Sequence, residues 1–200
     1  MDQPKTIKLS KLLSYILRHG AAKHKLTMRP DGYVVLSDIL ALAKFKTYTG
    51  EDIEHVVKTN DKQRFKLTEI DSVWMIRANQ GHSIKNVNQD ELLERIGTPE
   101  SIVIHGTSLN NWQQIKTQGL SRMNRLHIHF AIGLPGESGV ISGMRATSQV
   151  YIYIDMEKAM HDGIVFYRSS NNVILTEGQN GVLLVKYFKQ VVDCQGKSLL

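Results

Sequence analysis

Arginine and histidine side chains occur at four places in the chain where their types and spacing could bind an anion. In chain order these are the adjacent Arg18 and His19, then Arg64, then the alternating Arg125, His127 and His129, and finally Arg145. A guanidinium offers a planar fork of donors that matches phosphate oxygens, and an imidazole adds a donor that can also release a proton. No Ser/His/Asp order and no Walker-type loop is evident in the sequence. The pattern therefore favours anion binding over acyl transfer or ATP hydrolysis.

Ordinary structural roles are the alternative for several of these residues. Arg18 and His19 end a predicted helix, where cations are stabilised by the helix dipole. Arg64 alternates with Phe65 in a predicted strand, so it would face solvent if Phe65 enters the core. Arg145 lies on a glycine-rich loop before a strand, where it could either reach an anion or remain on the surface.

The histidine-rich stretch has a third interpretation, a metal site. Arg125, His127 and His129 alternate in a predicted strand over 127–131 and the residues before it, so all three would project from one face. Two histidines at i and i+2 can chelate zinc. Neither a carboxylate nor a cysteine lies nearby in the sequence to complete the site, so we predict no metal.

Two further stretches could line a site. Gln80, His82 and Ser83 follow a predicted strand, and they form either a linker or the lining of a cleft between domains, where ligands tend to bind. The second stretch, His105-Gly106-Thr107, ends a short apolar strand. Its glycine allows a ligand to approach the backbone closely, and the residues on either side could bind hydroxyl groups.

The N-terminal part of the chain must position the first group of these residues. An apolar face predicts a helix over 7–19 that stops at Gly20. Ser37 or Asp38 would cap a helix over 39–45, and Thr49 would cap another over 50–59. Strands are predicted over 34–36, 64–68 and 72–77. Helices followed by a two-stranded ribbon indicate a winged-helix-like lobe over residues 1–82.

A more polar stretch over 83–100 predicts a linker that contains a short helix over 90–96. Beyond it, short strands with few helices indicate a split β-sheet lobe over 101–200. The predicted strands cover 102–105, 127–131, 150–155, 165–167, 173–175 and 182–188. The predicted helices cover 110–118 and 156–161. The fold class expected is therefore α+β with two lobes.

Composition bounds the class of protein. The chain has 200 residues, of which 42% are hydrophobic and 22% charged, so it can bury a core. No apolar run approaches the roughly 18–20 residues of a membrane helix. The single cysteine, Cys194, excludes an internal disulfide and favours a reducing compartment in the cytoplasm or nucleus. The net charge of +6 would attract polyanions, although it is also an ordinary surface charge.

Considered together, the motifs resemble the RNA 2′-phosphotransferase family over roughly residues 7–190. The stretches that carry the resemblance are LSKLLSYILRHG, PDGYV, KQRF, IRANQGHS, IHGT, HIHFA, SGMR and DGIVFYRSSNNVILTEG. The resemblance implies an N-terminal winged-helix-like lobe and a C-terminal ADP-ribosyltransferase-like lobe. The longer loop GLPGESGVISGMR resembles the eukaryotic branch of the family.

The resemblance also implies roles for individual residues. The family's catalytic histidine and three arginines correspond by motif to Arg18, His19, Arg64 and Arg145. His105, Gly106, Thr107 and His129 would bind NAD⁺, and Gln80, His82, Ser83 and Arg125 would contact RNA or phosphate. Val173 occupies the position where ADP-ribosyltransferases commonly carry glutamate. An anionic phosphate needs positioning and charge neutralisation rather than a base to activate it, so the absence of glutamate fits this family.

The implied reaction has two steps and uses NAD⁺ as a co-substrate. An internal RNA 2′-phosphate, expected in tRNA, attacks C1″ of the nicotinamide ribose and expels nicotinamide. The ribose 2″-hydroxyl then attacks phosphorus, which releases 2′-hydroxyl RNA and ADP-ribose 1″,2″-cyclic phosphate. We expect a monomer that binds 2′-phosphorylated RNA and no membrane. The alternatives are an ADP-ribosyltransferase that caps phosphorylated nucleic-acid ends and a non-catalytic RNA-binding module.

Overall fold

The chain folds into two compact units, one ending at Leu92 and the other beginning at Leu93. The computed structural model describes residues 2–137, 139–141 and 143–200, so Ser138 and Ser142 of the predicted glycine-rich loop lie outside the described residues. Each unit has a hydrophobic core of its own. The protein is a mixed α/β chain with several small sheets, which agrees with the expected class at that level.

The first unit begins with helix α1 (Gln3–Tyr15). It starts earlier than the predicted residue 7 because Asp2 caps it: the Asp2 carboxylate accepts a hydrogen bond from the Lys5 N–H at 2.8 Å. Leu9 and Leu13 are buried, whereas Ile7 is 49% exposed. The apolar face is thus shorter than the pattern indicates, and the polar N-terminal turns are stabilised locally.

The helices that follow agree only in part with the prediction. Helix α3 (Gly50–Thr59) has the predicted bounds, and its Thr49 cap forms a reciprocal capping box with Asp52. The prediction of one helix over 39–45 is wrong. Helix α2 (Leu36–Leu40) starts earlier, and an extended Leu42 separates it from a 3₁₀ turn, η3 (Ala43–Phe45).

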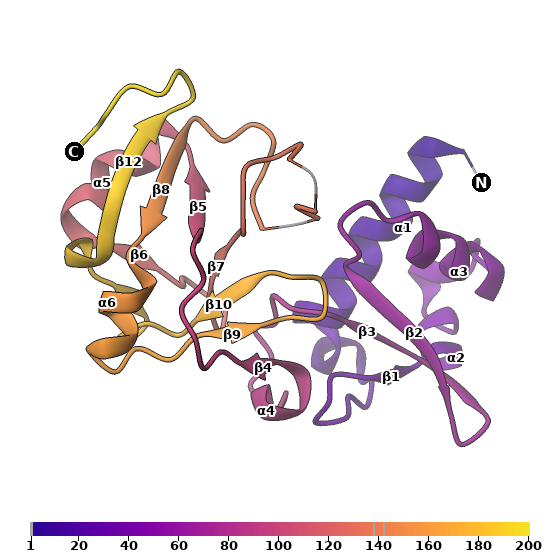
Figure 1. Ribbon diagram of the computed structural model, residues 1–200. Helices are drawn as coiled ribbons and strands as arrows, with labels where there is room; N and C mark the ends of the chain where they lie inside the picture. The colour runs from indigo at the N-terminus through magenta and orange to yellow at the C-terminus, as the bar shows by residue number, and fades with distance from the viewer. Residues whose placement is uncertain (1, 138, 142) are drawn as a thin grey trace. The chain divides into compact units, whose positions relative to one another are not determined.

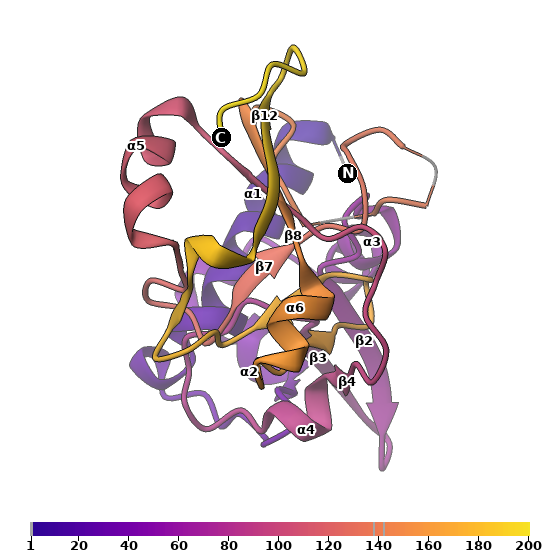
Figure 2. The same cartoon turned by 60° about the vertical axis from the view of Figure 1, so that its left-hand side comes forward.

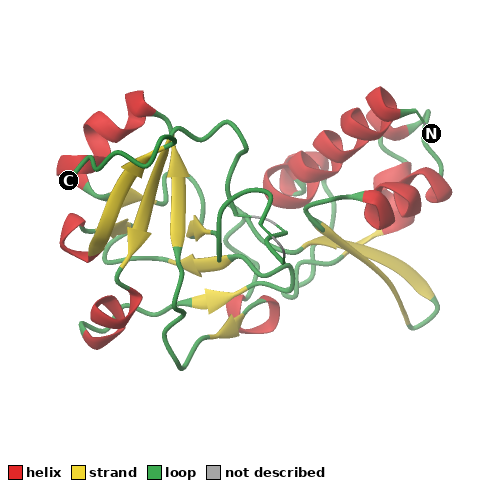
Figure 3. Ribbon diagram, turned by 45° about the horizontal axis from the view of Figure 1, so that its top comes forward, coloured by secondary structure: helices red, strands yellow, loops and turns green. Residues whose placement is uncertain are grey.

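A three-stranded antiparallel sheet of order β1-β3-β2 completes the first unit. Strand β1 (Val34–Val35) pairs with β3 (Val73–Ala78), which forms a hairpin with β2 (Phe65–Ile70). The long hairpin is visible in Figure 3. Phe65 pairs with Ala78 in the register, and both are buried in the core of this unit.

The second unit contains two antiparallel sheets and a small additional ribbon. The sheet β12-β8-β5 consists of β12 (Phe188–Asp193), β8 (Val150–Ile154) and β5 (Ile104–Thr107), which lie side by side in Figure 1. The sheet β4-β9-β10-β7 consists of β4 (Glu94–Arg95), β9 (Tyr167–Arg168), β10 (Ile174–Thr176) and β7 (Ile128–Phe130). The ribbon pairs β11 (Val182–Leu183) with β6 (Leu120–Ser121).

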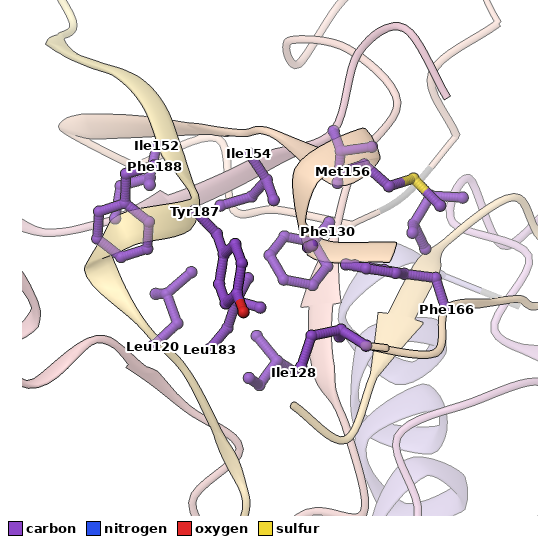
Figure 4. Packing of buried hydrophobic residues seen from close by; sticks show 14 of the residues in the cluster. Leu120, Ile128, Phe130, Ile152, Ile154, Met156, Phe166, Leu183, Tyr187 and Phe188 are labelled. Carbon is purple, nitrogen blue, oxygen red and sulfur yellow. The ribbon is translucent and has the colours of Figure 1, made fainter. Parts of the chain in front are cut away.

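The two sheets meet where β5 approaches the end of β7. The N–H of Ile104 donates to the Ala131 carbonyl at 2.9 Å, and the N–H of Ala131 donates to the Ile104 carbonyl at 2.8 Å. Aromatic and aliphatic side chains form the core of this unit, including Phe130 of β7, Phe166 just before β9 and Tyr187 just before β12 (Figure 4). This contact brings the predicted 105–107 and 127–131 stretches together.

Short helices connect these strands. Helix α5 (Leu109–Gln118) is capped by Ser108, and α6 (Met156–His161), which follows the end of β8 in Figure 2, is capped by Asp155. Helix α4 (Gln89–Leu92) is shorter than the predicted 90–96, because the chain enters β4 at Glu94. Among the described residues, no helix has the length and apolar character needed to cross a membrane.

One predicted strand is wrong. The stretch 182–188 contains a whole two-residue strand, β11, a 3₁₀ turn, η4 (Val185–Tyr187), and the first residue of another strand, β12. The two strands pair with different partners, β6 and β8. The apolar residues of the stretch do not reveal the change of partner, because periodicity reports burial and not which strand lies alongside.

Candidate functional site

Arg18 and His19 lie in a π-helical segment, η1 (Ile16–Gly20), that continues α1. π-Helical turns are frequent at functional sites. Arg18 is half-buried and His19 is exposed. The π-helical segment ends at Gly20, where the helix stop was predicted, and a 3₁₀ turn, η2 (Ala22–His24), follows before Lys25, which has a left-handed backbone conformation.

Ser83 connects the Arg18–His19 pair to the polar stretch after β3. The Ser83 N–H donates to the Arg18 carbonyl oxygen at 2.9 Å, and the Ser83 hydroxyl lies 3.4 Å from the same oxygen. His19 Nδ1 lies 2.9 Å from the Ser83 hydroxyl oxygen. Because a carbonyl can only accept, the hydroxyl donates to it and accepts from a protonated Nδ1. In the neutral ring Nε2 is then an acceptor.

The same stretch packs against the Arg18 side chain. A β-carbon built on Gly81 would lie 3.4 Å from Arg18 Nε, so the guanidinium lies over this glycine. Gln80 and His82 are buried, and a β-carbon built on Gly32 in the predicted turn would lie 3.6 Å from His82 Nε2. Arg18, His19 and the predicted Gln80–Ser83 stretch therefore lie together in the first unit.

Arg64 immediately precedes β2 and is oriented by Asn60. Asn60 Oδ1 accepts from the Arg64 N–H at 3.1 Å and from Arg64 Nη1 at 3.2 Å. Asp61 Oδ1 lies 3.9 Å from Nη1, and the Arg64 side chain is 30% exposed. The Asn79 N–H donates to the Arg64 carbonyl at 2.9 Å. The hairpin register thus places Arg64 at the start of the Gln80–Ser83 stretch.

Three polar residues near this cluster were not selected from the sequence: Asn60, Arg77 and Asn79. Asn79 Nδ2 donates to the Gln63 carbonyl at 2.6 Å, while Asn79 Oδ1 is buried without a hydrogen-bond partner among the described residues. Arg77 stacks on the Tyr33 ring, with 4.7 Å between the guanidinium carbon and the ring centroid. For Arg77 the available signal was its charge within β3, whose second half is otherwise buried, whereas Asn60 follows α3 and Asn79 follows β3.

In the second unit, His105 on β5 is fixed by the backbone of β7. His105 Nδ1 lies 2.9 Å from the His129 carbonyl oxygen, and a carbonyl can only accept, so Nδ1 carries the proton. Burial lowers the pKa of His105, so the ring is neutral at pH 7 and Nε2 is an acceptor. A neutral Nε2 can accept a hydrogen bond from a ligand hydroxyl.

Gly106 is approached by the protein's own loop. A β-carbon built on Gly106 would lie 2.6 Å from Ser148 Oγ and 2.9 Å from Met144 Sδ. The loop is fixed from the other side by Gly143, where a β-carbon would lie 2.6 Å from Ala131 Cα. The sequence suggested that Gly106 admits a ligand. In the structure the close approach is made by the segment that carries Arg145.

Arg125 and Arg145 belong to one electropositive region of the second unit. Burial lowers the pKa of Arg125, and the charge of Arg145 lowers it further. The charge of Arg125 also adds to the effect of burial on the pKa of His105. Arg145 itself is exposed. The expectation that Arg125 lies on the strand with the two histidines is wrong, because β7 starts only at Ile128.

His127 and His129 mark the beginning of β7. His129 pairs with Leu175, which in turn pairs with Tyr167, and the His127 ring lies 5.8 Å from the Tyr167 ring. Burial, with a smaller effect of the Arg122 charge, lowers the pKa of His127 to about 4. In the described part of the chain, no group of three or more histidine, cysteine, aspartate or glutamate side chains is arranged to hold a metal ion.

Val173 lies just before β10 and is fully buried. Its N–H donates to Ser169 Oγ at 3.0 Å, and its carbonyl accepts from the Ser169 N–H at 3.0 Å. The side chain at this position is therefore an apolar part of the interior, and it cannot activate a nucleophile.

Comparison with known families agrees with the arginine and histidine motifs described above. The family model described as "RNA 2′-phosphotransferase, Tpt1 / KptA family" matches residues 4–178. The chain belongs to the RNA 2′-phosphotransferase family. All the site residues discussed above lie within the matched range.

Individual relatives support the same assignment. The tRNA 2′-phosphotransferase 1 of Danio rerio is 47% identical over 94% of this chain and 86% of its own length. The Homo sapiens protein of the same name is 46% identical over 96% of this chain and 78% of its own length. A Schizosaccharomyces pombe relative is 51% identical over 96% of this chain, and the chain spans about half of that relative, 52% of its length.

Proposed function

We propose that the chain transfers an internal RNA 2′-phosphate, such as that at a tRNA splice junction, to NAD⁺. The products are 2′-hydroxyl RNA, nicotinamide and ADP-ribose 1″,2″-cyclic phosphate. Family membership and the names of the relatives support this proposal. The observation that carries it is the Arg18–His19 pair, fixed in a π-helical turn by Ser83 and packed over Gly81. A guanidinium and an imidazole that are both fixed by the same stretch of chain are each suited to a phosphate.

The two units are proposed to correspond to the two lobes of the family. In the first, helices α1, α2 and α3 precede the β2–β3 hairpin, and β1 completes the sheet. This arrangement supports a winged-helix-like lobe. In the second, two antiparallel sheets that meet through Ile104 and Ala131 support an ADP-ribosyltransferase-like lobe. A tRNA substrate would place the activity inside the cell.

The residues of the second unit fit NAD⁺ as a co-substrate. His105 presents a neutral Nε2 acceptor suited to a ribose hydroxyl, and Thr107 follows on the same strand. His127 Nε2 is buried and has no hydrogen-bond partner among the described residues, so it is a second imidazole nitrogen that could form a hydrogen bond with a ligand. Arg125 and Arg145 supply positive charge suited to a pyrophosphate or to the transferred phosphoryl group.

In the first step the RNA 2′-phosphate oxygen forms a bond to C1″ of the nicotinamide ribose, and the bond from C1″ to nicotinamide breaks. Arg18, His19 and Arg64 would neutralise and orient the attacking phosphate, since proximity is itself catalytic. In the second step the ribose 2″-hydroxyl attacks phosphorus and the RNA 2′-oxygen leaves. Nε2 of His19 would accept the proton of the 2″-hydroxyl and pass it to the leaving RNA 2′-oxygen, and the arginines would stabilise charge on the phosphoryl oxygens.

The test uses a single-stranded oligonucleotide with one internal 2′-phosphate, NAD⁺ and the Arg64→Ala variant. We expect conversion to 2′-hydroxyl RNA to fall by about 10²–10³-fold, as for loss of one charge-stabilising donor, with accumulation of RNA that carries ADP-ribose on its 2′-phosphate. Arg95→Ala is the matched control, because Arg95 is exposed on β4. Mass analysis of the products identifies each species.

Two outcomes would contradict the proposal. Wild-type protein that leaves a stable ADP-ribose on the RNA is an ADP-ribosyltransferase, and wild-type protein that binds RNA without nicotinamide release is a binding module. The same assay with Arg125→Ala and Arg145→Ala determines which of these two arginines takes part in phosphoryl transfer. The arginine that acts shows the larger loss of phosphoryl transfer.

A further inference from the structure

A polar groove runs along α1 in the first unit and ends at Arg64. Its volume is about 730 Å³. One wall is a polar stripe of α1 formed by Thr6, Ser10, Lys11 and Ser14, and the other wall is the last part of α3, with His55 and Thr59. At the rise of a helix, the stripe from Gln3 to Ser14 is roughly 16 Å long. A few consecutive nucleotides of an extended single strand can cover this length.

The end of the groove is continuous with the residues proposed to bind phosphate. Asn60 Nδ2 lies 3.4 Å from Ser10 Oγ, and Asn60 Oδ1 accepts from the backbone and side chain of Arg64. Asn60 therefore links α1 to Arg64 and forms part of the groove lining. A phosphate bound at Arg64 would have the adjoining part of its strand at the mouth of the groove.

The chemistry of the lining matches a sugar–phosphate backbone. Lys11, His55 and Arg64 are cationic or can become so, whereas Asp61 is the carboxylate among the lining residues, and its side chain is 83% exposed and lies 3.9 Å from Arg64 Nη1. Serine and threonine hydroxyls can donate to phosphate oxygens and accept from ribose 2′-hydroxyls. Ile7, which is 49% exposed in the lining, offers an apolar surface to a base.

We propose that this groove binds the RNA strand that flanks the 2′-phosphate, with Lys11 in contact with a backbone phosphate. The proposal rests on the proposed function, because it takes Arg64 as a contact to the 2′-phosphate. The proposed role of the groove between α1 and α3 is to bind the part of the RNA that lies beyond the reacting 2′-phosphate.

Lys11→Gln tests the groove, and Lys8→Gln is the matched control. Both lysines are exposed on α1, but Lys11 lines the groove and Lys8 lies outside it. Fluorescence anisotropy measures the Kd of each variant for two RNAs, a 2′-phosphorylated dinucleotide and a longer single strand with nucleotides on both sides of the 2′-phosphate. Repeating the titration at several salt concentrations counts the phosphate contacts.

For the longer RNA we expect Lys11→Gln to raise Kd severalfold and to reduce the slope of log affinity against log salt by about 0.7, the value for one contact to a single strand. The dinucleotide should be affected less, and Lys8→Gln should match the wild type with both RNAs. Equal behaviour of the two variants, or an equal loss of both RNAs in Lys11→Gln, would overturn the proposal. Because binding is measured without NAD⁺, an absence of phosphotransfer by the wild type would refute the proposed function and leave this comparison valid.

Discussion

The Ser83 hydroxyl determines how the His19 ring is oriented. This hydroxyl accepts from His19 Nδ1 and is directed to the Arg18 carbonyl. These contacts direct Nδ1 of His19 toward Ser83 rather than toward a substrate. Ser83 was selected from the sequence as a contact to RNA or phosphate, and the structure supports a positioning role in addition.

Ser83→Ala should therefore reduce kcat more than it changes KM. Loss of the acceptor frees the His19 ring to rotate, and a displaced catalytic group can cost up to roughly a hundredfold in rate. Ser83→Thr keeps the hydroxyl and is expected to retain most of the activity. Steady-state kinetics with 2′-phosphorylated RNA and NAD⁺ measure both constants. A rise in KM for RNA with kcat unchanged would instead identify Ser83 as a substrate contact.

His127 predicts a specific dependence of stability on pH. Its pKa is lowered by burial to about 4 from 6.5, so the folded protein binds this proton more weakly than the unfolded chain. The contribution of His127 to stability is complete above about pH 6.5 and is lost as the pH falls toward 4, by about 3 kcal/mol over the whole range.

His127→Phe should remove this part of the acid sensitivity. Between about pH 7 and pH 5, the free energy of unfolding of the variant is expected to fall by about 2 kcal/mol less than that of the wild type. Urea unfolding followed by circular dichroism at each pH measures the difference. His161→Phe is the control, since the His161 side chain is 89% exposed. Parallel curves for wild type and His127→Phe would contradict the assignment.

At the scale of elements, the loop that carries Arg145 is positioned by glycines. Gly143 has φ +124°, a conformation that favours glycine, and a β-carbon there would lie 2.6 Å from the Ala131 backbone. The next residue, Met144, packs over Gly106 of β5. Both contacts fix the loop to strands that carry His105 and His129.

Gly143→Ala should therefore disturb both stability and the use of NAD⁺. Backbone strain alone is expected to cost about 1–3 kcal/mol, and the clash with Ala131 would displace the loop and raise KM for NAD⁺. Gly139→Ala is the matched control, because Gly139 also has a positive φ, +82°, but has open space around it. Thermal unfolding and NAD⁺ kinetics compare the two. Equal effects would show that strain, and not the contact with Ala131, matters.

At the scale of the whole molecule, the residues proposed to act are divided between two units with separate cores. All the residues proposed to bind NAD⁺ belong to the second unit. We therefore expect NAD⁺ to raise the Tm in the absence of RNA. At a hundredfold excess over Kd the stabilisation would be about 2.7 kcal/mol.

Single substitutions in each unit test this division. His105→Ala should abolish the NAD⁺-dependent rise in Tm, because it removes the proposed hydroxyl acceptor, whereas Arg18→Ala in the first unit should keep most of it. Differential scanning fluorimetry at increasing NAD⁺ concentrations measures the shift. A rise in Tm that requires RNA, or that persists in His105→Ala, would contradict the assignment of NAD⁺ binding to these residues.

The sequence by itself determined the family and the local elements with strong end signals. Helix α3 has its predicted bounds because Thr49 and Asp52 cap it reciprocally, and α6 has them because Asp155 caps it. Capping interactions act over a few residues, so helix ends can be predicted from a short stretch of the sequence. The order of the motifs around Arg18, Arg64 and His105 is similarly a property of the sequence alone.

Only the tertiary structure decided which segments meet. The stretch 182–188 is divided between two strands with different partners. The Ser83 contact with His19 and the close approach of Met144 to Gly106 join residues that are far apart in the sequence. Their physical basis is packing and hydrogen-bond pairing between distant segments. Hydrophobic periodicity records that a side chain is buried, but the identity of its neighbour depends on the folded arrangement of the whole unit.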